Sequence, residues 1–180
     1  MGLRAWNAAV LVGAVAVWLA TGTREAKPVF ADNAKSDAVR VLETDVARHP
    51  GDAALVQKLA QTYLDNRAPG LAVTLIEGSP AEVRDQPRVG HVLARALVEE
   101  GQNQEALAVE QHVLDTCGGL DAAALARGCD ATLVVSATRR TEILQELVKL
   151  GVEDAQEKPE ETSVAYRNAT REARVQIAAE

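Results

Sequence analysis

The side chains best suited to chemistry in this 180-residue chain are its two cysteines and three histidines. No two histidines have the H-x-x-x-H spacing of a zinc-binding helix, and no serine or cysteine lies in a G-x-S-x-G turn. The glycines form no phosphate-binding G-x-G-x-x-G loop, and the acidic side chains at Glu99 and Glu100 are adjacent rather than stacked along a helix. The sequence therefore predicts no catalytic residue, no metal site and no cofactor, and a protein that is not an enzyme.

Cys117 and Cys129 bracket a short segment and are the only cysteines in the chain. In an exported protein an even number of cysteines at close spacing favours a disulfide. A bridge across a loop of this size contributes on the order of 3 kcal/mol in the chain-entropy account. The alternatives are two buried free thiols or a redox or metal role, but the latter lacks a C-x-x-C pair.

Residues 1–31 have the layout of a secretory signal. Arg4 precedes an uninterrupted apolar run over residues 8–20, and no charge occurs between Arg4 and Arg24. A retained membrane anchor is the competing interpretation, since the charge-free residues 5–23 approach the roughly 20 needed to cross a bilayer. A third interpretation is that these residues form a buried core helix. The first two predict an exported protein of the periplasm or cell envelope, anchored in the inner membrane if residues 5–23 are retained.

The charge distribution makes nucleic acid an unfavourable partner. The formal net charge is −7, and because residues 1–31 carry three basic side chains against one acidic, the remainder is more acidic still. Such a body repels phosphate backbones. After residue 31 only Tyr63 and Tyr166 are aromatic, so no platform for stacking bases is expected.

Apolar residues at helical spacing predict an all-α protein. The expected helices cover residues 35–48, 53–65, 71–77, 87–100, 105–114, 131–150 and 160–179. The two central hairpins repeat with a step of 34 residues, seen in pairs that share a residue type or size: Leu59 with Leu93, Ala60 with Ala94, Tyr63 with Leu97, Ala72 with Ala106, and Leu75 with Val109. The same step backwards reaches Ala38 and Val41, which with Leu42 and Val46 predict the buried stripe of the first helix.

Over residues 35–114 these features resemble the tetratricopeptide repeat (TPR) family. Leu59-Ala60 and Leu93-Ala94 match its large-then-small pair, and Pro50 matches the proline that closes a unit. Gly90 departs from the family pattern, because a tryptophan is usual there. The resemblance implies antiparallel hairpins stacked as a short solenoid, with a C-terminal hairpin as a cap. A generic antiparallel bundle is the alternative.

The resemblance also implies a partner surface on the first helix of each unit. The corresponding positions are Gln57, Gln61, Asp65, Arg88, His91, Arg95 and Glu99. Within this set Arg88, His91 and Arg95 have i, i+3, i+7 spacing, a basic strip able to hold an acidic peptide or a terminal carboxylate. An ordinary solvated helix face is the alternative.

These observations predict three regions: residues 1–31 as signal or anchor, 32–116 as TPR-like repeats, and 117–180 as a C-terminal helical region that caps the stack or binds a partner. The predicted function is a non-catalytic scaffold or adaptor of the cell envelope that binds a protein or peptide. A membrane-anchored assembly or maturation factor and a structural subunit of an envelope complex are the alternatives, and an oligomer is compatible with either.

Overall fold

The computed structural model describes the backbone of residues 33–118, 121–155 and 157–178, and the side chains from residue 37 to residue 170 within those ranges. The predicted all-α class is confirmed, since every regular element in these ranges is a helix. The elements are α2 (Asn33–Arg48), α3 (Ala53–Asp65), α4 (Pro69–Glu77), α5 (Ala81–Arg84), α6 (Pro87–Glu99), α7 (Asn103–Cys117), α8 (Ala122–Ala126), α9 (Ala131–Lys149) and α10 (Pro159–Ala178).

The helix boundaries follow from capping residues that the sequence displays. The carboxylate of Asp52 accepts hydrogen bonds from the backbone N–H groups of Ala54 and Leu55, at 2.9 and 3.2 Å, and so begins α3. Pro69 and Pro87 occupy the first turns of α4 and α6, where the missing N–H costs nothing. Gly101 has φ +78°, and this left-handed residue separates α6 from α7.

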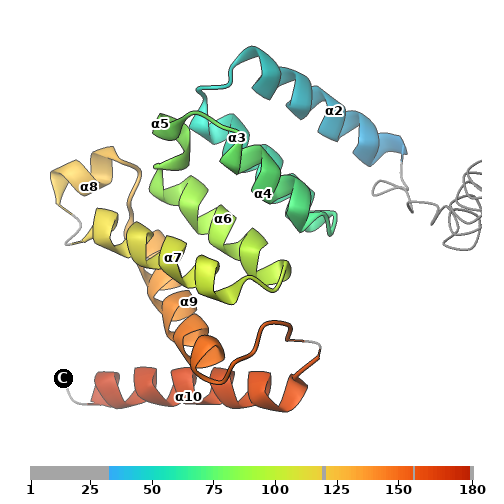
Figure 1. Cartoon of the computed structure of the whole chain (residues 1–180). Helices are drawn as coiled ribbons and strands as arrows, with labels where there is room; N and C mark the ends of the chain where they lie inside the picture. Colours follow the sequence, from blue (N-terminus) through green and yellow to red (C-terminus); the bar gives the residue numbers. More distant parts are fainter. Residues whose placement is uncertain (1–32, 119–120, 156, 179–180) are drawn as a thin grey trace, which may run out of the picture.

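The helices follow one another from α2 at one end of the molecule to α10 at the other (Figure 1). Consecutive long helices pack in pairs: α3 on α4, α4 on α6, α6 on α7, α7 on α9, and α9 on α10. Two further contacts join alternate helices, α3 to α6 and α6 to α9. The short helix α8 lies against α7.

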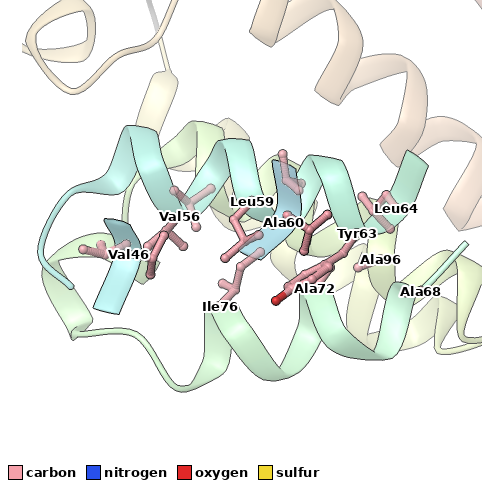
Figure 2. Packing of buried hydrophobic residues seen from close by; sticks show 14 residues of the cluster. Val46, Val56, Leu59, Ala60, Tyr63, Leu64, Ala68, Ala72, Ile76 and Ala96 are labelled. Atoms are coloured by element: carbon pink, nitrogen blue, oxygen red, sulfur yellow. The ribbon is translucent and has the colours of Figure 1, made fainter. Parts of the chain in front are cut away.

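The apolar core runs along this series of helices. Its largest cluster joins α2, α3, α4 and α6, with Leu59 and Ile76 enclosed between them (Figure 2). A second cluster joins α6 and α7 to α9 and α10 through Leu97, Leu144 and Ala165. Each hairpin therefore buries its apolar face against the next one, as a helical hairpin with a single apolar stripe must.

The predicted stripe of the first helix is wrong in part. Val39 is buried in α2, with Val46 beside α3, whereas Ala38 is exposed and Val41 is 60% exposed. Among the helices that the structure describes, α2 packs on α3 alone, and its buried side chains lie on the side toward α3. The hydroxyl of Tyr63 donates a hydrogen bond of 2.7 Å to Glu43 and ties the two helices together. Burial and that hydrogen bond raise the pKa of Tyr63, which keeps the hydroxyl a donor.

The sequence analysis missed the short helices α5 and α8, which span four and five residues and are too short to show a period. On α10, Ala165 and Ala169 are buried, whereas Tyr166 is 49% exposed.

Among the helices that the structure describes, none is long and apolar enough to cross a membrane. The predicted signal or anchor at residues 1–31 lies outside the described residues.

Candidate functional site

The predicted disulfide between Cys117 and Cys129 is confirmed. The two Sγ atoms lie at bonding distance, and both residues are buried, with Cα atoms 5.5 Å apart. The bridge joins Cys117, the last residue of α7, to Cys129, and so closes a loop that contains α8.

Arg88 of α6 is fixed by this loop. Its Nε donates to the carbonyl of Gly128 at 2.9 Å, and its guanidinium forms an ion pair with Asp130. Asp130 also accepts from the backbone N–H of Leu133 at 2.7 Å and so begins α9. The pKa of Asp130 lies below its ordinary value, mainly because of that backbone hydrogen bond and secondly because of the nearby Arg88 cation. The predicted strip residue Arg88 is thus committed to an internal contact.

His91, the second residue of the predicted strip, belongs to a polar cluster between three helices. Its Nδ1 lies 2.7 Å from Oε1 of Glu110 on α7, and its Nε2 lies 3.1 Å from the hydroxyl of Ser136 on α9. Arg140 donates to the same Glu110 oxygen at 2.9 Å and to the carbonyl of His91 at 2.9 Å. The Glu110 side chain is completely buried; its Oε1 makes both contacts, whereas its Oε2 has no hydrogen-bond partner among the described residues.

Ser136, His91 and Glu110 are arranged in the order of the serine–histidine–acid triad of hydrolases. The neighbouring Arg140, however, disfavours the positively charged histidine that such a triad needs. A nucleophilic serine requires the histidine to carry positive charge after it has taken the serine proton. The Arg140 Nη1 lies 3.2 Å from His91 Nδ1 and repels such a charge. The geometry supports a cluster that fixes the register of α6, α7 and α9.

The third strip residue, Arg95, faces solvent at the junction of α3 and α6. It pairs with Glu99 at 3.1 Å and lies 4.0 Å from Asp65 of α3. Gln61 is exposed and Gln57 half-buried on α3. We call the surface formed by the solvent-facing side chains of α3, α6 and α9 the α3–α6–α9 face. It contains the predicted positions Gln57, Gln61, Asp65, Arg95 and Glu99, whereas Arg88 and His91 point from α6 into contacts with the loop and α9.

A cavity of about 320 Å³ opens on this face between α6, α9 and α10. Arg95, Arg139 and Arg140 give it a basic lining against the single acidic side chain of Glu99. Its apolar lining comes from α6, α9 and α10, through Val98, Ile143, Leu144, Leu147 and Tyr166. The local positive charge of this cavity contrasts with the net charge of −7 of the whole chain.

Sequence reasoning missed Arg139 and Tyr166. Both residues lie in the C-terminal region, outside the repeat whose positions were transferred. The i, i+4, i+8 spacing of Arg139, Ile143 and Leu147 along one helix is the signal that could have found this surface.

In the part of the chain that the structure describes, no three His, Cys, Asp or Glu side chains lie close enough together to hold a metal ion.

Comparison of the chain with protein-family models, with curated proteins and with solved structures found no match.

Proposed function

We propose that this protein is a non-catalytic scaffold of the cell envelope, built as a short stack of TPR-like hairpins, which holds a segment of a partner protein on its α3–α6–α9 face. The hairpins are α3 with α4, α6 with α7, and α9 with α10, and α2 stands as the second helix of an incomplete first unit.

The observation that carries this proposal is the order of packing. The first helix of each hairpin contacts the first helix of the next, α3 to α6 and α6 to α9, while the second helices α4 and α7 each fill the space behind two first helices. Stacks with this neighbour pattern expose one continuous surface, which repeat proteins use to bind extended segments. The 34-residue step between the central hairpins agrees with the pattern.

We infer that the C-terminal hairpin, which packs against α7 at the end of the stack, also extends the surface. Arg139 and Ile143 of α9 line the same cavity as Arg95 of α6, so the face continues onto the third hairpin. Export is supported by the buried disulfide, since such bonds persist in oxidising compartments.

The test compares two double variants with matched changes of charge. Gln61→Arg with Arg139→Glu alters the α3–α6–α9 face, and Gln111→Arg with Arg84→Glu alters α7 and α5, away from it. All four positions are exposed. The immobilised proteins are incubated with envelope extract of the source organism. We expect the first variant to lose the proteins that wild type retains and the second to keep them; the reverse result would contradict the proposal.

A further inference from the structure

The cavity between α6, α9 and α10 has two chemically different ends. Its lining on α9 runs from Ser136 through Arg139 and Ile143 to Leu147. At 1.5 Å per residue this stripe is about 16 Å long, the length of about five residues of extended chain. The pairing of Arg88 with Asp130 and of His91 with Ser136 shows that α6 runs in the same direction as α9.

Positive charge gathers at the end of the cavity near Ser136. Arg140 is already committed to Glu110 and Arg95 to Glu99. Arg139, by contrast, is exposed and forms no ion pair with any side chain that the structure describes. A ligand carboxylate can therefore pair with Arg139 without breaking an internal contact.

Apolar surface gathers at the other end. Ile143 and Val98 are half-buried there, and Tyr166, which is 49% exposed, lines the cavity beside them. An exposed aromatic ring beside aliphatic side chains is an anchor for a bulky apolar group, since the ring is rigid and costs little entropy to order.

We propose that this cavity binds an internal, extended segment of a partner in which an acidic side chain is followed within about three residues by a large aliphatic or aromatic one. The acid pairs with Arg139, and the apolar side chain packs on Ile143 and Tyr166. An acidic side chain within a segment fits because the cavity offers one cation outside any ion pair among the described residues, Arg139, with the apolar lining one turn further along α9. This inference rests on the proposed function and specifies its ligand.

The test uses fluorescence anisotropy with the full chain and a labelled five-residue peptide of alternating Glu and Leu, acetylated and amidated at its ends. A Gln/Leu peptide and a Lys/Leu peptide are the comparisons, and a Glu/Leu peptide with a free carboxyl end is a fourth probe. We expect the capped acidic peptide to bind about tenfold tighter than the Gln version, the usual effect of one charge-assisted hydrogen bond, and to weaken as salt rises.

Arg139→Glu should weaken binding of the acidic peptide at least about tenfold. Arg84→Glu, the same change at an exposed site outside the cavity, should leave it within about twofold. Tyr166→Ala should weaken all Leu-containing peptides alike, and circular dichroism confirms that each variant is folded.

Three results would overturn the inference: equal binding of the acidic and Lys peptides, no effect of Arg139→Glu, or binding only of the peptide with a free carboxyl end. If none of the peptides binds while the Gln61→Arg/Arg139→Glu variant still loses its captured proteins, this inference fails and the proposed scaffold function stands. If that variant loses nothing, the proposed function itself fails.

Discussion

His91 Nδ1 lies 2.7 Å from Oε1 of Glu110, a carboxylate that is fully enclosed between α6, α7 and α9. Arg140 reaches the same oxygen from α9. Through Oε1, one buried carboxylate therefore receives partners from two other helices, and these contacts favour one packing register of the second and third hairpins.

Removal of one partner of this cluster should destabilise the fold strongly. We expect Glu110→Ala, which leaves Arg140 without its counter-charge, to lower the free energy of unfolding by about 3–5 kcal/mol in urea titrations. The double variant Glu110→Leu/Arg140→Met should recover much of the loss, because it leaves no buried charge. Arg139→Ala, next to the cluster but exposed, should change stability by less than about 0.5 kcal/mol. A double variant no more stable than Glu110→Ala would contradict this account.

The disulfide should stabilise the protein by holding the α8 loop. The variant Cys117→Ala/Cys129→Ala should lose about 2–4 kcal/mol of unfolding free energy. Since the loop contains Gly128 and leads directly into Asp130, which caps α9, amide hydrogen exchange should also accelerate in the first turn of α9. Exchange that accelerates only in α2 or α10 would show that the bridge does not act through this loop.

Gly90 allows α6 and α7 to approach closely. A Cβ at this buried position would lie 3.0 Å from Cγ2 of Val113. We expect Gly90→Ala to cost about 1–3 kcal/mol, measured by chemical denaturation, and the added Val113→Ala to relieve part of that cost. Gly51→Ala is the matched control, because nothing lies within 4 Å of its Cβ. A stabilising Gly90→Ala would contradict the close approach.

Glu146 should make stability depend on pH in the acid range. Asn168 donates to its carboxylate at 2.7 Å and Lys149 at 3.2 Å, and these hydrogen bonds lower the pKa of Glu146 below its ordinary value of 4.5. A carboxyl whose pKa is lower in the folded state stabilises the fold above pH 4.5 and loses that contribution as the pH falls through its folded value.

The measurement is the thermal midpoint of wild type and Glu146→Gln from pH 7 to pH 2. We expect the variant to be less stable at pH 7 and the difference to vanish in acid. A Glu146→Gln difference that stays constant over this pH range would remove the assigned cause.

The elements with strong local signals were predictable from the sequence. The bounds of α3 match the prediction because Asp52 caps its first turn and the apolar residues Val56, Leu59 and Tyr63 leave one choice of buried face. The disulfide was predictable because only two cysteines exist and they lie close together.

Features that depend on distant partners were not predictable. On a helical wheel of α2, Val39 and Val41 are equally plausible as core residues. The choice between them depends on which side of α2 packs on α3. Glu110 has the sequence context of a solvated helix residue, and its burial depends on Arg140, thirty positions later. Arg88 and His91 have the spacing of an exposed strip, but Arg88 bonds to Gly128 and His91 to Ser136, contacts that no local pattern predicts.

The central claim is that a partner lies on the α3–α6–α9 face, and site-specific photo-crosslinking tests it most directly. A photoreactive amino acid replaces Gln61, Arg139, Arg84 or Gln111 in turn, and the protein is irradiated with envelope extract. We predict crosslinked partner bands from positions 61 and 139 and none above background from positions 84 and 111. Crosslinks confined to positions 84 and 111 would contradict the claim.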